Sequence, residues 1–438
     1  MVENIIENEN VTVKIDREPN CIIKMEVTAS PDLVKKARKK AVKTIAKDVD
    51  IPGFRKGKAP ADILEKKYPE HIDERWQKVI ADDAFLAAQK AKHTPVLNNN
   101  TQIIFNMKSH SLNDGAEMSF SFETDPVIPT IEAEKFKLKE VKRKKVGKKE
   151  LDEYLKQVQL MYAEWNEAED RPIKEKDYII LDIESLEGED KGQNIFSDTR
   201  FEVSKEAMAK WMKAAVLGKK KGDVIETVSK VDKEVSKDEQ MPDKKVKITV
   251  KKIEEPKLLP LDDTFAKGLN FPSIKELTEY AEKMLNDKAD QAKDTEERQQ
   301  VNAFLLTYDA NLPKSLVESE LNHRKKQQLE NPAFKAKFEN ASKEEKESIE
   351  KEMLHSSKEA VLLFYLSRKV CEDAKIPIKY EEVEQESRMI MYKAGIYDQK
   401  EISKEVQALS LSRLLLRKAQ DYVLRGVKKL DPREGSEL

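Results

Sequence analysis

The residues best suited to chemistry lie in one short stretch, DVDIPGFRKGKAPADILEKKYP, residues 48–69. A Pro-Gly pair and a second glycine predict a tight, exposed turn, because proline fixes φ and glycine accepts a positive φ. One phenylalanine lies within this turn among basic residues. An aromatic ring between cations is typical of a binding anchor, in which the ring fills a pocket and the cations engage negative charge. The candidate binding residues are Gly53, Phe54, Arg55, Lys56, Gly57 and Lys58.

The partner predicted for this stretch is structured RNA, recognised by shape and phosphates, or a protein with an acidic surface. A helix predicted after Ser30-Pro31 adds basic residues beside the turn, opposite an apolar face from Val34 to Val49. Residues 31–67 contain twelve Lys or Arg against five Asp or Glu. Such a patch attracts phosphate backbones by counterion release. Two alternatives to a binding surface remain. The charged residues could form an ordinary solvated helix face, and the phenylalanine ring could fold back onto the helices of its own domain.

Composition narrows the class of protein. The chain has 438 residues, which predicts two to four domains, and 37% of them are charged. The two cysteines, Cys21 and Cys371, form no CxxC pair and predict neither a disulfide framework nor a zinc site. No metal and no cofactor are expected, and the absence of a GxxxxGK[ST] motif argues against a bound nucleotide. We expect a cytoplasmic protein, because the sequence contains no signal peptide and no apolar run long enough for a membrane span.

The sequence predicts a multidomain α+β protein. Residues 1–124 alternate between strand and helix patterns, with a helix-loop-helix whose tip is the stretch above. Residues 125–170 read as an extended, proline-containing linker followed by a helix, and residues 171–255 as a small β-rich domain. Residues 256–438 predict an all-α domain, which we expect to be elongated with projecting arms because several helices carry only thin apolar stripes.

The family resemblance described below implies a protein that holds unfolded chains, and scattered apolar residues on these arms would suit weak, multivalent contact with such chains. The candidate client-binding residues are Leu316, Val317, Leu321, Phe334, Phe338 and Met353. Met389, Met391 and Tyr392 are further candidates, because methionine adapts to varied partners. The alternative for each of these residues is packing between helices.

The segment GFRKGKAP, residues 53–60, resembles the ribosome-docking signature GFRxGxxP of the bacterial trigger factor family. The order of domains and the segment NLPKSLVESEL from Asn311 resemble the same family along the whole chain. The resemblance implies an ATP-independent chaperone that docks beside the ribosomal exit tunnel, on ribosomal protein and rRNA, and holds nascent and unfolded polypeptides. It also implies docking through Phe54, Arg55 and Lys56, and a homodimer away from the ribosome.

The resemblance further implies that the β-rich domain is an FKBP-type peptidyl-prolyl cis-trans isomerase, with an aromatic pocket that grips a twisted X-Pro bond. The pocket positions implied here are Phe196, Phe201 and Met212. Several family aromatics are missing: Ile183 and Val246 stand where aromatics are usual, and Trp211 lies one position from the pocket floor. We therefore expect the fold to be kept and the pocket to be degraded.

Three functions compete at this point. The first is the ribosome-associated chaperone, and the second is an enzyme acting mainly as a prolyl isomerase on unfolded proteins. The third, from composition alone, is a coiled-coil scaffold with a nucleic-acid-binding head, which the lack of sustained heptads disfavours. The specific loop favours the first.

Overall fold

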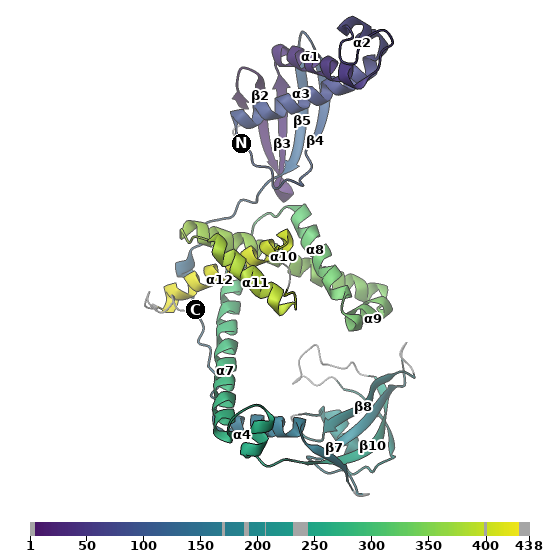
Figure 1. The fold of residues 1–438 in the computed structure, drawn as a ribbon, viewed down its shortest axis with the longest axis vertical. Helices are drawn as coiled ribbons and strands as arrows, with labels where there is room; N and C mark the ends of the chain where they lie inside the picture. Colours follow the sequence, from purple (N-terminus) through teal and green to yellow (C-terminus); the bar gives the residue numbers. More distant parts are fainter. Residues whose placement is uncertain are drawn as a thin grey trace. The chain divides into compact units, whose positions relative to one another are not determined.

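The protein was analysed as a computed structural model, which describes residues 5–168, 171–187, 192–205, 207–230, 244–397 and 401–428. The chain separates into two compact units: residues 1–140 with 296–438, and residues 141–295. The multidomain α+β class is confirmed, since two antiparallel sheets are followed by helices alone (Figure 1). The proposed boundaries at 124, 170 and 255 stay predictions. The predicted linker helix belongs to the second unit, with the β-rich domain.

The first sheet has the order β1-β2-β3-β5-β4. Its strands are β1 (Ile5–Glu7), β2 (Val11–Glu18), β3 (Ile22–Ala29), β4 (Ile104–Ser111) and β5 (Gly115–Glu123). Alternating residues of β2, β3 and β5 are buried, as period-two patterning requires. The predicted break between β2 and β3 is confirmed at a short 3-10 turn, where Asn20 has a φ of 61°.

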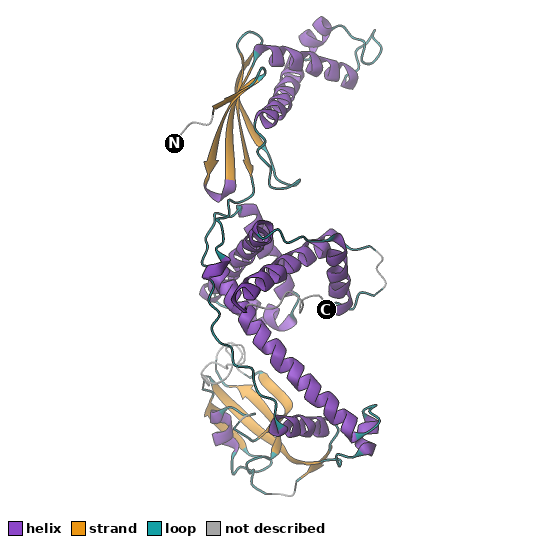
Figure 2. Cartoon of the chain, turned by 90° about the vertical axis from the view of Figure 1, so that its left-hand side faces the viewer, coloured by secondary structure: helices purple, strands orange, loops and turns teal. Residues whose placement is uncertain are grey.

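Three helices accompany this sheet: α1 (Pro31–Asp48), α2 (Ala61–Lys67) and α3 (Pro69–Ala91). Figure 2 shows α1 and α3 covering one face of the sheet. The Ser30 hydroxyl caps α1 by accepting from the Leu33 amide, as predicted. The shared core contains Val34 and Ala37 of α1, Trp76 and Ile80 of α3, and Phe120 of β5. This packing holds the loop between α1 and α2 at one end of the domain.

The second sheet has the order β6-β10-β7-β8, with β9 paired to β10. Its strands are β6 (Glu164–Glu167), β7 (Tyr178–Ser185), β8 (Asn194–Glu202), β9 (Val224–Val228) and β10 (Lys245–Lys257). A short helix, α5 (Lys210–Val216), packs against it. The linker helix, α4 (Lys148–Met161), ends earlier than expected. Trp165, predicted to be helical, lies in β6, which pairs antiparallel with β10.

The remaining helices are α6 (Asp263–Gly268), α7 (Ile274–Leu305), α8 (Lys314–Leu329), α9 (Pro332–Asn340), α10 (Lys343–Asp373), α11 (Tyr380–Lys393) and α12 (Lys404–Lys428). The predicted capping box is confirmed at α10: the Glu345 amide donates to Ser342 Oγ, and the Ser342 amide donates to Glu345 Oε2. Val301, Leu366 and Leu415 contribute to one core shared by α7, α10 and α12. These helices are therefore better packed than their thin apolar stripes suggested.

Candidate functional site

The loop between α1 and α2 has a backbone fixed by hydrogen bonds. The Gly57 amide donates to the Ala46 carbonyl of α1 at 2.8 Å, and the Phe54 amide donates to the Ile51 carbonyl at 3.1 Å. Gly53 and Gly57 have φ values of +90° and +79°, in the left-handed region that glycine adopts without steric cost. The loop is therefore a defined structure tied to the end of α1.

The two large apolar residues of the loop lie in different environments. Ile51 is 6% exposed and belongs to a small core with residues of α1, α2 and α3. Phe54 is 40% exposed and belongs to no core cluster. Ile51 thus anchors the loop, and the Phe54 ring is left partly in water, as a binding anchor requires.

The cations next to Phe54 in the loop sequence are not neutralised by ion pairs within the described part of the chain. Arg55, Lys56 and Lys58 are exposed, and none of them forms an ion pair with any residue whose position is described. The predicted loop residues therefore lie together on one exposed tip, with only Gly57 half-buried. Their role in binding stays a prediction.

The basic face of α1 is smaller than the sequence indicated. Arg38 stacks on the Trp76 ring at 4.6 Å from its centroid and pairs with Glu65 at 3.1 Å. Lys40 pairs with Asp83 at 2.8 Å. These two cations are neutralised by residues far away in the sequence. The lysines left exposed and without an ion pair in the described part of the chain are Lys35, Lys36, Lys39, Lys43 and Lys47.

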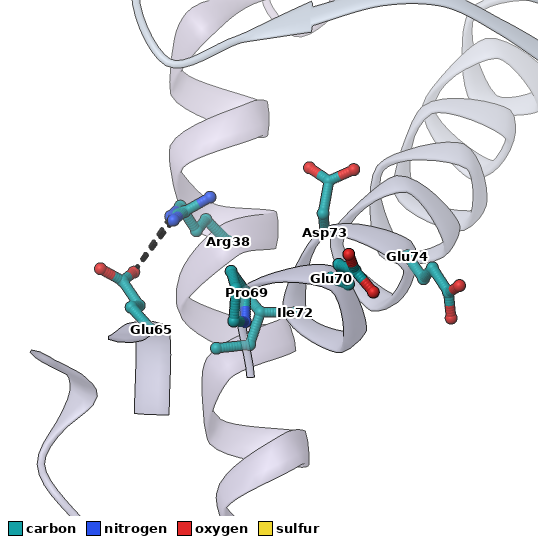
Figure 3. A pocket seen from close by; sticks show the side chains of 7 residues that line it. All are labelled: Arg38, Glu65, Pro69, Glu70, Ile72, Asp73 and Glu74. Atoms are coloured by element: carbon teal, nitrogen blue, oxygen red, sulfur yellow. Dashed lines mark hydrogen bonds and ion pairs between the residues drawn. The ribbon is translucent and has the colours of Figure 1, made fainter. Parts of the chain in front are cut away.

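A hollow of about 580 Å³ lies between α1, α2 and the start of α3 (Figure 3). Its charged lining residues include Arg38, which bonds Glu65, and the carboxylates Glu70, Asp73 and Glu74. Carboxylates outnumber cations here, so the hollow is unsuited to phosphate. The exposed lysines and the loop tip, and not this hollow, make up the surface that suits a polyanion.

The predicted isomerase residues lie at the core of the β-rich domain. The Phe196 and Phe201 rings meet edge to face with centroids 5.5 Å apart. Met212 is 5% exposed and belongs to the core of the domain, against which both rings pack. The structure thus brings the three residues to one core, and their part in catalysis stays a prediction.

At two positions where the family pattern has aromatics, this chain has buried aliphatic side chains. Ile183 and Val246 are fully buried in the same core, and Trp211 is half-buried against it. Aliphatic groups at these two positions remove ring edges that could contact a proline ring. This arrangement agrees with a pocket that keeps the fold and has lost part of its aromatic lining.

The six predicted client-binding residues are placed unevenly. Val317 and Met353 are each 6% exposed, in α8 and α10 respectively. A buried side chain offers no apolar surface to a client, so these two residues have a packing role in this structure. The other four are half-buried and stay predictions: Leu316, Leu321, Phe334 and Phe338.

A more exposed apolar surface lies on α11 and the turn after it. Tyr392 is 68% exposed and Tyr397 is 70% exposed, and their rings meet at 5.5 Å. Met389 is exposed beside them, as is Tyr380 at the start of α11, whereas Met391 is buried. Tyr380 and Tyr397 were missed in the sequence, where only the density of Tyr and Met residues around them was a signal. We call Tyr380, Met389, Tyr392, Ile396 and Tyr397 the α11 surface.

A mostly apolar groove of about 280 Å³ adjoins the α11 surface. Tyr380 and Val383 of α11, together with Leu411 of α12, line it. Below it, the Ser387 hydroxyl donates to Ser410 Oγ at 2.8 Å and connects the two helices. Tyr380 belongs to both the groove and the α11 surface, and neither is a deep, specific pocket, which suits partners that share no sequence.

Within the described ranges, no three His, Cys, Asp or Glu side chains come together as metal ligands. None of the helices with described positions is long and apolar enough to cross a bilayer.

Fold and site together define a multidomain α+β protein with a cationic, aromatic-tipped loop on its first domain and exposed Tyr and Met side chains on its last. A family model described as "Bacterial trigger factor protein (TF)" matches residues 11–158. A second, "Bacterial trigger factor protein (TF) C-terminus", matches residues 273–425. The two models together match more than half of the chain. The chain belongs to the bacterial trigger factor family.

Individual relatives agree along the length of the chain. A "Trigger factor" of Protochlamydia amoebophila is 28% identical, covering 87% of this chain and 86% of the relative. The "Trigger factor" of Chlamydia pneumoniae is 27% identical and covers 97% and 98% of the two chains. A solved structure, described as "Promiscuous Substrate Recognition in Folding and Assembly Activities of the Trigger Factor Chaperone", aligns with a TM-score of 0.51 at 19% identity. It covers 95% of this chain and 99% of the solved one, and shows that the fold is similar.

Proposed function

We propose that this chain is an ATP-independent chaperone that docks on the ribosome near the exit tunnel and holds nascent and unfolded polypeptides. Family membership supports the chaperone role, and the solved relative is described as a chaperone with folding and assembly activities. The observation that carries the docking proposal is the Phe54 ring, 40% exposed on a rigid tip, among cations that form no ion pair with a described residue. The protein would act in the cytoplasm, where translating ribosomes are found.

Docking combines two kinds of contact. The Phe54 ring enters an apolar pocket on a ribosomal protein, and burying the rest of its surface supplies the affinity. Arg55 and Lys56 engage rRNA phosphates or carboxylates at the rim of that pocket, which makes the affinity depend on salt. Because the hydrogen bond from Gly57 to Ala46 fixes the loop before binding, little conformational entropy is lost on docking.

Client holding is assigned to the helical domain. The α11 surface offers exposed aromatic and methionine side chains beside a mostly apolar groove. Each contact is weak, but several along one extended chain raise the overall affinity without requiring a sequence motif. The half-buried candidates of α8 and α9 add to this surface where they reach solvent: Leu316, Leu321, Phe334 and Phe338.

The docking proposal is tested by co-sedimentation with bacterial ribosomes at two salt concentrations. The variant is Phe54→Ala/Arg55→Ala/Lys56→Ala, and the matched control is Leu86→Ala/Arg75→Ala/Lys78→Ala, three exposed residues of α3 with the same chemistry. We expect the unchanged chain and the control to pellet with ribosomes, less so at high salt, and the loop variant to remain in the supernatant while folded. Equal pelleting of the loop variant and its control would rule out the loop as the anchor.

Prolyl isomerisation is the second candidate function, favoured by the edge-to-face pair of Phe196 and Phe201 beside Met212. Isomerisation as the main activity is the weaker alternative, because aliphatic residues occupy two positions where the family usually has aromatics.

Self-association of the free chain into a homodimer also remains a prediction from the family. Sedimentation velocity over a range of protein concentrations, with and without ribosomes, would test it.

A further inference from the structure

A second group of exposed cations lies far from the docking loop, in residues 141–149, which lead into α4. We call this segment the basic strap. Its exposed cations are Lys142, Lys144, Lys145, Lys148 and Lys149. Among ion pairs between described residues, only Lys149 of this group takes part, with Glu153 at 3.8 Å. The other four lysines form no ion pair with any residue that the structure describes.

The strap is held against α7 by its other residues. Arg143 forms a two-pronged ion pair with Asp290, with Nε–Oδ1 at 2.5 Å and Nη2–Oδ2 at 3.0 Å. The same Nη2 donates to Asn286 Oδ1 at 2.9 Å, and Val141 is 7% exposed. All of these residues belong to the second compact unit. The paired arginine and the buried valine fix the strap, and the lysines between and after them remain in water.

Two nearby carboxylates, Glu150 and Asp290, have other hydrogen-bond partners and form no ion pair with a strap lysine among the described residues. Glu150 Oε2 accepts from the Gly147 amide at 2.9 Å and caps α4. Hydrogen bonds from its own amide and from the Gly147 amide, together with the charges of Lys144 and Lys149, lower the Glu150 pKa. Asp290 is held by Arg143. In addition, Lys148 and Lys149 occupy the first turn of α4, where the positive end of the helix dipole disfavours cations. This concentration of like charge is unfavourable in the free protein and becomes favourable when an anion binds.

We propose that the basic strap binds the phosphate backbone of structured RNA, independently of base sequence and of the docking loop. The chemistry of the strap favours RNA over a protein partner. Its apolar residues are turned inward, since Val141 is buried and Val146 is half-buried. A protein interface needs an apolar or aromatic anchor at its centre, whereas contacts to phosphates need only cations. The inference concerns residues 141–149 alone and does not depend on Phe54.

The proposal is tested on the full chain by fluorescence anisotropy with a labelled RNA hairpin, titrated at several salt concentrations. The strap variant is Lys142→Gln/Lys144→Gln/Lys145→Gln/Lys148→Gln. The matched control replaces four exposed lysines of α6 and α7 in the same unit: Lys267→Gln/Lys275→Gln/Lys283→Gln/Lys288→Gln. The loop variant Phe54→Ala/Arg55→Ala/Lys56→Ala is measured in parallel. Each phosphate contact contributes about 0.7–0.9 to the slope of log affinity against log salt.

We expect the slope of the strap variant to be smaller than that of the unchanged chain by about 3. Between about 50 and about 200 mM salt, the unchanged chain then loses about sixty-fold more affinity than the strap variant does. The α6–α7 control and the loop variant should keep most of the slope. If the loop variant no longer pellets with ribosomes, the docking proposal is supported. If the same variant still binds the RNA hairpin, the RNA-binding residues lie outside the docking loop, as the strap proposal requires.

Two results would overturn the strap proposal. The first is an equal change of slope in the strap variant and the α6–α7 control, which would mean that net charge alone sets RNA affinity. The second is unchanged RNA affinity together with lost affinity for an acidic polypeptide, with polyglutamate as the probe, which would assign the strap to a protein partner. A failed ribosome assay with the loop variant would leave the RNA result standing, so the two proposals fail separately.

Discussion

Replacing two phenylalanines of the first domain by alanine should have opposite effects on stability and on ribosome binding. Phe54 lies on the loop tip, 40% exposed and outside every core cluster. Phe120 lies in β5, 2% exposed, with its ring 5.2 Å from that of Phe85. The same atoms are removed in both variants, so any difference comes from their surroundings.

The expected magnitudes follow from burial. Truncating a fully buried phenylalanine costs about 3–5 kcal/mol, through lost transfer free energy and the cavity that remains. Phe120→Ala should lower the free energy of unfolding of the first domain by this amount. Phe54→Ala should lower it by about 0.5 kcal/mol or less, as for other surface changes. A central interface aromatic contributes about 2 kcal/mol or more to binding, so Phe54→Ala should weaken ribosome binding by about thirty-fold or more.

The stability assay can be confined to the first domain by its one tryptophan. Trp76 is 6% exposed and donates to the Val34 carbonyl at 3.0 Å, so its emission should shift to longer wavelength when this domain unfolds. The other two of the three tryptophans are removed by Trp165→Phe/Trp211→Phe. Urea titration in this background gives the free energy of unfolding of the first domain for each variant. Ribosome pelleting is measured below the unfolding temperature of the less stable variant.

Two outcomes would refute this reasoning. A loss of 2 kcal/mol or more (about the scale of a buried side chain) in Phe54→Ala would mean that the ring is packed onto its own domain. Unchanged ribosome affinity in Phe54→Ala, with stability also unchanged, would mean that the ring contacts neither its own core nor the ribosome. Folded Phe120→Ala should pellet like the unchanged chain; if it does not, the sheet itself contributes to docking.

Three further predictions concern the other domains. Tyr392→Ser/Tyr397→Ser should weaken suppression of aggregation of a diluted, unfolded protein in light scattering; the matched control, which should keep it, is Tyr162→Ser/Tyr280→Ser. Burial raises the pKa of Asp177, but hydrogen bonds from Arg171 outweigh it and hold that pKa below its ordinary value. The ionised carboxylate thus stabilises the fold above about pH 4, and this stabilisation is lost as the pH falls through the lowered pKa of Asp177. Asp177→Asn should therefore reduce the dependence of Tm on pH below about pH 4. A proline-peptide assay should find at most weak isomerase activity; a rate like that of an intact FKBP-type enzyme would contradict the degraded pocket.

The sequence was most informative where structure is determined by neighbouring residues. The Ser342–Glu345 capping box, the Ser30 cap and the strand alternation are local patterns, and all of them are present. It was least informative where a distant partner decides. In the sequence alone, Arg38 resembles the exposed lysines around it, because its contacts with Trp76 and Glu65 form only in the folded domain. The same reason explains the buried client candidates, because no local pattern distinguishes an apolar residue that faces another helix from one that faces solvent.

The two candidate binding surfaces differ in a way that matches their proposed partners. The docking loop has a fixed backbone, set by two glycines at positive φ and by the amide of Gly57, and it presents one ring. For a partner of constant shape, such rigidity increases binding affinity, because the entropy of ordering the loop is lost at folding and not at binding. The α11 surface instead distributes exposed tyrosines and Met389 along a helix and a turn, with many side-chain rotamers available. Binding of clients of varied sequence requires such adaptability, so making the α11 surface more rigid should narrow the range of clients. Making the docking loop more rigid should change ribosome affinity little, because its backbone is already fixed.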